Sequence, residues 1–294
     1  MVYSVPLSRR IAACLALILS TLSLEGQAMT TITDIEYASV GERRLLLDLY
    51  LPETESAAPL VIWIHGGAWR AGSKNKPPVL AIVAEGFALA SLDFRNSPEA
   101  AFPAQMHDIK AAIRFLRAHA GQYAYRPDQI VLWGYSSGGH LAALAGLTGD
   151  EAALEGELGN HAGISSAVQA IIDYSGPTNF ESILHQSTPH GLSVRVSALE
   201  LLLGKAPTDP AIKELLHMAS PVHQVDMNAP PLLILHGIQD NQVPINQSLE
   251  LASAYRTQGR PVEVEWLLEA QHTSGEYFQT PYIRKVADFL HRVL

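Results

Sequence analysis

One serine in the chain stands where a catalytic nucleophile could stand. Ser136 is the middle residue of G-Y-S-S-G at 134–138, between the apolar run I-V-L-W and the helix-forming stretch L-A-A-L-A-G-L. Glycines two positions before and after a serine leave room for a strained strand–turn–helix corner that exposes the hydroxyl. The pattern therefore predicts that Ser136 is a nucleophile, whereas Ser137 is not framed in this way. A plain turn built from small residues is the alternative.

A glycine pair could stabilise the charge that such a nucleophile creates. The sequence H-G-G-A-W at 65–69 directly follows the apolar run L-V-I-W-I. Acyl transfer places negative charge on a carbonyl oxygen, and preorganised backbone N–H groups stabilise that charge. We expect Gly66 and Gly67 to form the oxyanion hole together with the N–H of Ser137. A tight turn that needs glycine only for its backbone is the alternative.

An acid and a base follow in the order that this chemistry requires. Asp240 comes shortly after an apolar run at 232–237, and His272 after another at 262–268. A carboxylate that orients a histidine, which in turn deprotonates serine, needs both side chains at neighbouring strand ends. We therefore predict Asp240 as the acid and His272 as the base. Asp226 and Glu269 remain alternatives for the acid.

The other candidate residues carry weaker signals. His223 and His236 lie before or within a predicted strand, so neither is placed to act as the base. Trp69 and Tyr135 adjoin the predicted site in sequence and are candidates for substrate binding. Because serine, histidine and backbone donors suffice for acyl transfer, no metal or cofactor is predicted.

The elements around these residues alternate between apolar runs and helical patterns, which is typical of an α/β domain. Several runs are continuously apolar, as in strands buried on both faces of a parallel sheet. We predict one domain at 29–294 with helices on both faces of a mostly parallel sheet. Its eight expected strands lie at 32–40, 45–51, 60–65, 88–93, 130–134, 171–175, 232–237 and 262–268.

One long connection, at 176–231, contains no clear strand. It contains helical patterns near 197–203 and 211–218. Long connections in compact domains tend to serve function. We expect this segment to form a small cap over the site; an ordinary surface excursion is the alternative.

The composition argues against one class of protein, those that bind nucleic acids. The net charge is −9 and basic residues are scattered along the chain, which argues against a nucleic-acid-binding surface.

The amino-terminal segment suggests export. At 1–28, Arg9 and Arg10 precede an apolar run at 11–24, and the small residues Gly26 and Ala28 follow it, a pattern typical of a signal peptide. The run is too short to span a bilayer comfortably. We expect cleavage after Ala28 and a secreted or periplasmic protein without a membrane span; an N-terminal helix is the alternative.

Taken together, the motifs resemble a known group, the hormone-sensitive-lipase and feruloyl-esterase-like (BD-FAE) esterases of the α/β hydrolases. The segment at 65–69 is similar to that group's H-G-G-x-W, and 91–120 to its D-Y-R…F-P-A segment. The segment at 134–142 is similar to G-x-S-A-G-G-x-L-A, and 236–244 to H-G-x-x-D-x-x-V-P. Ser137 stands where that group usually has alanine.

The resemblance implies an α/β-hydrolase fold and a serine carboxylesterase that acts on a small-molecule ester through an acyl-enzyme on Ser136. A small cap favours short acyl groups, because a long chain gains affinity only where apolar cover buries it. The alternatives are an acetyl- or feruloyl-type esterase on plant polysaccharide and an amidase or formamidase with the same triad. A catalytically inactive binding protein is a further alternative, disfavoured because nucleophile, acid, base and oxyanion donors are all present. The sequence does not indicate an oligomeric state.

Overall fold

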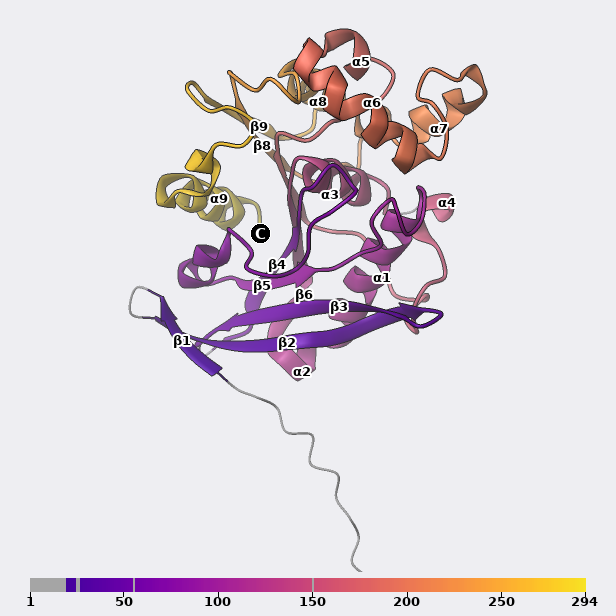
Figure 1. Ribbon diagram of the computed structural model, residues 1–294. Helices are drawn as coiled ribbons and strands as arrows, with labels where there is room; N and C mark the ends of the chain where they lie inside the picture. Colours follow the sequence, from indigo (N-terminus) through magenta and orange to yellow (C-terminus); the bar gives the residue numbers. More distant parts are fainter. Residues whose placement is uncertain (1–19, 25–26, 55, 150) are drawn as a thin grey trace, which may run out of the picture.

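Nine strands form one mixed sheet in the computed structural model, which describes residues 20–24, 27–54, 56–149 and 151–294 (Figure 1). Their order across the sheet is β1-β2-β3-β5-β4-β6-β7-β8-β9. The strands are β1 Ser20–Leu24, β2 Gln27–Val40, β3 Arg43–Pro52, β4 Ala58–Ile64, β5 Ala88–Leu92, β6 Tyr125–Tyr135, β7 Ala170–Tyr174, β8 Leu232–Gly237 and β9 Val262–Leu267.

Strand direction divides the sheet into two parts. From β1 to β5 the neighbouring pairs are antiparallel, and from β5 to β9 they are all parallel. Because parallel strands end at one edge, the loops after β4, β6, β8 and β9 can converge there. Eight of the nine strands correspond to the eight predicted from apolar runs.

The central strands are buried on both faces, which explains their continuous apolar runs. In β4, Leu60, Ile62 and Ile64 belong to one core cluster, whereas Val61 and Trp63 belong to the other. Side chains alternate between the two faces of a strand, so both faces of β4 need apolar residues. The same alternation recurs in β6 and β8.

Helices cover both faces of the sheet, as predicted. Helices α1, α3 and α8 pack on one face, and α9 packs on the other with the 3₁₀ helix Leu80–Glu85. The helices are α1 Ala104–Ala118, α2 Ala120–Tyr123, α3 Ser137–Leu147, α4 Ala152–Glu155, α5 Ile183–Gln186, α6 Pro189–Leu203, α7 Lys213–Met218, α8 Asn246–Thr257 and α9 Thr280–Val293. Further 3₁₀ helices are Pro210–Ile212, Pro221–His223 and Gly275–Phe278.

The connection at 176–231 contains three helices, α5, α6 and α7, which Figure 1 shows together at one end of the molecule. The two predicted helical patches correspond to α6 and α7. Ala198, Leu199 and Leu202 of α6 belong to the same core cluster as α1 and α3. This segment therefore packs on the body of the domain through an apolar helix face.

Most of the predicted signal peptide lies outside the described residues, namely 1–19 and 25–26. Its described part includes Ser20–Leu24, which forms β1 and pairs with β2 at the edge of the sheet. Among the residues that the structure describes, no helix has both the length and the apolar character needed to cross a bilayer.

Candidate active site

Ser136 lies at the corner between β6 and α3, in a backbone conformation that only close packing sustains. Its φ is 57° and its ψ is −123°, an uncommon region for a residue with a side chain. A Cβ at Gly134 would lie 2.0 Å from the carbonyl oxygen of Gly138, and one at Gly138 would lie 2.1 Å from that of Ile64. Only glycine fits at either position. This steric demand is the physical reason for the G-x-S-x-G spacing.

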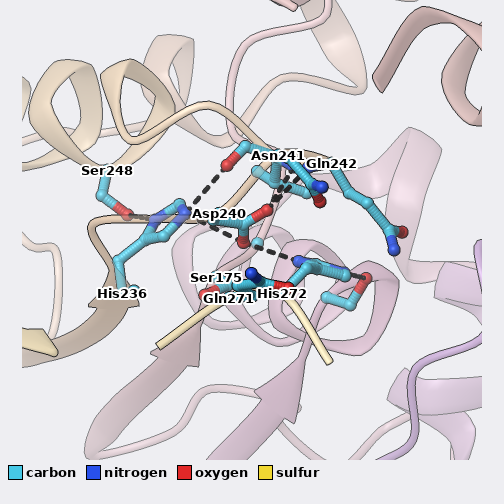
Figure 2. Close-up of polar contacts among 12 residues, drawn as sticks. Ser175, His236, Asp240, Asn241, Gln242, Ser248, Gln271 and His272 are labelled. Atoms are coloured by element: carbon cyan, nitrogen blue, oxygen red, sulfur yellow. Dashed lines mark hydrogen bonds and ion pairs between the residues drawn. The ribbon is translucent and has the colours of Figure 1, made fainter. Parts of the chain in front are cut away.

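The structure brings Ser136, His272 and Asp240 into one chain of hydrogen bonds. Oγ of Ser136 lies 2.9 Å from Nε2 of His272, and Nδ1 of His272 lies 2.6 Å from Oδ2 of Asp240 (Figure 2). The carboxylate only accepts, so Nδ1 carries the hydrogen and Nε2 of the neutral ring can accept the serine proton. All three side chains are nearly buried, which strengthens these interactions.

The Asp240 carboxylate is held from both sides. Its Oδ1 accepts hydrogen bonds from the backbone N–H groups of Gln242 and Val243, each at 2.8 Å. Burial raises the pKa of Asp240, but hydrogen bonds from His236 and His272 outweigh burial and hold the pKa well below its usual range. The carboxylate is therefore ionised at neutral pH, as orientation of an imidazole requires.

His236 is a further contact of this carboxylate, and the sequence does not predict it. Its Nε2 lies 3.3 Å from Oδ2 of Asp240, and its side chain is fully buried. In the sequence, its position within an apolar run argues against a role as the base and suggests no other role. The available sequence signal is that His236 precedes Asp240 by four residues. The turn after β8, in which the N–H of Asp240 bonds to the carbonyl of Gly237, brings Asp240 back over the strand end and so next to His236.

Of the expected oxyanion donors, Gly66 and Ser137 adjoin the nucleophile. A Cβ at Gly66 would lie 2.9 Å from the carbonyl oxygen of Tyr135 and 3.4 Å from Cβ of Ser136, so this loop touches the serine corner. Gly67 has a φ of 123°, and a Cβ there would lie 2.1 Å from the carbonyl of Ala71. Ser137 is the first residue of α3, where N–H groups have no acceptor within the helix. Within the described ranges, no group accepts a hydrogen bond from the N–H of Gly66, Gly67 or Ser137.

Trp69 is not placed to bind substrate, contrary to the sequence-based expectation. Its side chain is 0% exposed, and its Nε1–H donates to Nδ1 of His140 at 3.1 Å. Phe180 packs edge-on against its ring, and the Arg195 guanidinium lies 5.6 Å from the ring centre. The side chain of Trp69, the last residue of H-G-G-A-W, therefore belongs to the core.

Tyr135 contacts the base. Its hydroxyl donates to the main-chain carbonyl of His272, and its ring lies 5.4 Å from the imidazole, centroid to centroid. The phenol is thus engaged by the protein, in an orientation that supports the His272 loop. None of these contacts favours the expected role of Tyr135 in substrate binding.

Helix α6 contacts two of the loops that form the site. Near its start, Thr188 Oγ1 donates to the carbonyl of Asn241 at 2.8 Å, and Arg195 approaches the carbonyl of Gln242 at 3.4 Å. Further along, Ser197 accepts a hydrogen bond from Arg70, next to the H-G-G-A-W segment. The segment at 176–231 therefore contacts both the Asp240 loop and the residue that follows the H-G-G-A-W segment.

One group of side chains in the described part of the chain could converge on a metal ion, and it lies outside the triad. Glu181, His217 and His223 place ligand atoms within 4.8 Å of one another, all on exposed residues. The two imidazoles are stacked, with 4.1 Å between centroids and 11° between planes. Because ring nitrogens bind metals in the ring plane, nearly parallel rings cannot share one ion without rotating.

The α/β-hydrolase fold is defined by a serine at a strand–turn–helix corner of a mostly parallel sheet, with an aspartate and a histidine after later strands. This chain has that arrangement. The BD-FAE family profile matches residues 47–255, more than half of the chain. The chain belongs to the BD-FAE family.

Named relatives and solved structures agree with this assignment. The chain is 32% identical to esterase LipC of Mycobacterium tuberculosis over 69% of this chain, and it spans about half of LipC's length (49%). It resembles a truncated carbohydrate esterase from gut microbiota, with a TM-score of 0.81, 33% identity and coverage of 90% of this chain and 95% of that one. It also resembles the bifunctional GH43-CE of Bacteroides eggerthii, with a TM-score of 0.79, 34% identity and coverage of 89% and 38%.

Proposed function

We propose that this protein is a serine esterase that hydrolyses short-chain carboxylic esters through an acyl-enzyme on Ser136. The observation that carries the proposal is the continuous set of hydrogen bonds from Ser136 through His272 to Asp240. The esterase names of the relatives support it. The chain spans only about half of LipC's length, so the activity of whole LipC is not attributed to this protein.

The first half-reaction follows from the geometry. Oγ of Ser136 attacks the ester carbonyl while His272 Nε2 takes the hydroxyl proton, and Asp240 stabilises the imidazolium. The oxyanion of the tetrahedral intermediate accepts hydrogen bonds from N–H groups of Gly66, Gly67 and Ser137. Collapse breaks the bond to the alcohol oxygen, which leaves with the proton from His272. The acyl group remains on Ser136.

The second half-reaction repeats these roles with water. His272 takes a proton from a water molecule whose oxygen attacks the acyl carbonyl, and the same N–H groups bind the new oxyanion. Collapse breaks the bond to Ser136 Oγ, which recovers its proton from His272. The acid is released. These protein groups supply every proton transfer in the cycle.

The acetyl esters of carbohydrates are the second candidate substrate class. The supporting observation is that a solved structure 33% identical to this chain is a carbohydrate esterase. Feruloyl esters of polysaccharide belong to the same class of acylated sugars, and amides would use the same triad with a poorer leaving group.

A hydrolysis screen tests the proposal. We expect the highest kcat/KM on acetyl to butyryl esters, including acetylated xylo-oligosaccharides, and slower turnover of feruloyl esters and matched anilides or formamides. If an amide is hydrolysed faster than its matched ester, the protein is an amidase and not an esterase. Hydrolysis of none of these substrates by the folded protein would favour the binding-protein alternative.

We also propose that residues 1–28 direct export and are removed. The support is the order of Arg9-Arg10, the apolar run and Ala28 in the sequence. Amino-terminal sequencing of protein from the native host should find a start near Met29. A mature chain that still begins at Met1 would contradict the export proposal while leaving the esterase proposal intact.

A further inference from the structure

We infer that His236 is a positioning residue, whose Nε2–H holds the Asp240 carboxylate in the orientation in which that carboxylate binds His272. The inference rests on the proposed function, because it assigns His236 a role in the same triad. His236 lies at the end of β8 and is 0% exposed. Figure 2 shows its imidazole on the side of Asp240 opposite to His272.

The contacts of the His236 ring determine which nitrogen carries hydrogen. Nε2 lies 3.0 Å from the carbonyl oxygen of Val243, and a carbonyl only accepts hydrogen bonds. Nε2 is therefore protonated in either charge state of the ring. Nδ1 lies 2.7 Å from Oγ of Ser248 on α8, whose hydroxyl donates to it when the ring is neutral. Both nitrogens are engaged, so the ring cannot turn without losing a hydrogen bond.

Nε2 also lies 3.3 Å from Oδ2 of Asp240, at ion-pair distance, whereas its hydrogen bond goes to the carbonyl of Val243 at 3.0 Å. The polar edge of the ring therefore faces the carboxylate from beside that hydrogen bond. Oδ1 has two backbone donors, and Oδ2 has His272 at 2.6 Å and His236 at 3.3 Å. Four N–H groups therefore surround the carboxylate, two on each oxygen. Rotation of the carboxylate away from His272 would break contacts on both oxygens.

Burial makes the loss of one donor costly. The Asp240 side chain is 0% exposed, so water does not readily replace a missing N–H. Without His236, only His272 would contact Oδ2. The carboxylate could then rotate, and the imidazole would lose part of its orientation toward Ser136. The expected loss is in kcat, because substrate contacts are unchanged.

A double-mutant cycle tests the inference with wild type, His236→Leu, Asp240→Asn and the double variant, assayed with a fluorogenic acetyl ester. We expect His236→Leu to lower kcat about 10- to 100-fold, the range for a hydrogen bond to a buried charge. KM should change less than about threefold. In the Asp240→Asn background the same change should cost less than about threefold, because the charge that His236 holds is gone.

Two further variants separate positioning from structure. His236→Gln returns an amide N–H close to the position of Nε2 and should recover at least about a third of the wild-type kcat. His140→Leu is the matched control: the His140 side chain is equally buried and bonds to Trp69 and the Ala219 carbonyl, and in the described part of the chain it has no hydrogen bond or ion pair with a triad side chain. Its effect on kcat should be the same in both Asp240 backgrounds. Thermal unfolding of each variant confirms that it folds.

The outcomes distinguish this inference from the proposed function. Equal loss of kcat from His236→Leu in both backgrounds, or a His236→Gln variant as slow as His236→Leu, overturns the positioning role. A wild-type protein that hydrolyses no ester overturns the proposed function instead. If His236→Leu fails to fold, Ser248→Ala takes its place in the cycle, with an expected loss of a few-fold that disappears in the Asp240→Asn background.

Discussion

The hydroxyl of Tyr135 donates to the main-chain carbonyl of His272, and the two rings lie at 26° to each other. The residue that precedes the nucleophile in sequence therefore supports the loop that carries the base. This contact links the ends of β6 and β9, which are not neighbours in the sheet.

Tyr135→Phe removes this hydrogen bond and keeps the ring. We expect kcat to fall about 3- to 10-fold, the range for one neutral hydrogen bond, with KM within about twofold of wild type. Steady-state kinetics on an acetyl ester measure both. A variant with raised KM and unchanged kcat would show that Tyr135 contacts substrate after all.

Trp69→Phe should destabilise the protein without weakening substrate binding. The variant leaves Nδ1 of buried His140 without its donor and creates a cavity in the core. We expect the free energy of unfolding to fall by about 2 to 4 kcal/mol in urea titrations. KM for a short ester should stay within about twofold. Trp266→Phe, at a partly exposed position on β9, is the control and should cost about 1 kcal/mol or less.

Asp173, on β7, provides a prediction about pH. Burial raises its pKa to about 6 against the opposing effects of His236 and the Gly176 N–H. Within the described residues, its Oδ2 has no hydrogen-bond partner. The folded state therefore binds more protons than the unfolded state between about pH 4 and pH 6, so this group destabilises the fold as pH rises through that window.

Asp173→Asn removes that titration. Relative to wild type, the variant should gain about 3 kcal/mol of unfolding free energy between pH 4 and pH 8, the equivalent of a shift of about two pKa units. The depressed pKa of Asp240 contributes stability that is lost only at lower pH, and both proteins share it. Urea unfolding at several pH values gives the difference curve. A difference that does not vary with pH would rule out a raised pKa at Asp173.

The packing of α6 leads to a prediction about acyl-chain preference. The apolar residues Ala198, Leu199 and Leu202 of α6 pack into the core, so this face does not cover a long acyl chain. Each methylene that remains exposed gains none of the roughly 0.8 kcal/mol that burial supplies. We expect kcat/KM to peak between acetate and butyrate and to fall toward dodecanoate in a series of p-nitrophenyl esters. A steady rise through dodecanoate would indicate a buried acyl channel and a lipase.

The sequence was sufficient to predict the features that depend on local constraint. Gly134 and Gly138 are required by clashes with nearby backbone, so their spacing marks the serine corner before any tertiary structure is known. The continuous apolar runs reflect strands buried on both faces, and eight strands could be located from them. The order of Ser136, Asp240 and His272 along the chain reflects the order of strand ends in the sheet.

Other features depend on contacts that have no sequence pattern of their own. Adjacency to the glycine loop suggested that Trp69 lines the pocket, but Ala68 and Trp69 both have positive φ, 54° and 59°, and the ring lies in the core. Tyr135 meets the triad only because the end of β6 and the loop after β9 converge, whereas His236 meets Asp240 through the turn after β8. Such convergence is a property of the folded sheet.

Covalent labelling of Ser136 tests the central claim most directly. Wild type, Ser136→Ala and the control Ser253→Ala, which changes an exposed serine on α8, are each treated with a fluorophosphonate and digested for mass spectrometry. We predict one adduct, on Ser136, in wild type and Ser253→Ala, with hydrolysis of acetyl esters lost in step with labelling. Ser136→Ala should fold, take no label and lose about a millionfold in kcat. An adduct on another residue, or ester hydrolysis that persists in pure Ser136→Ala, would contradict the account.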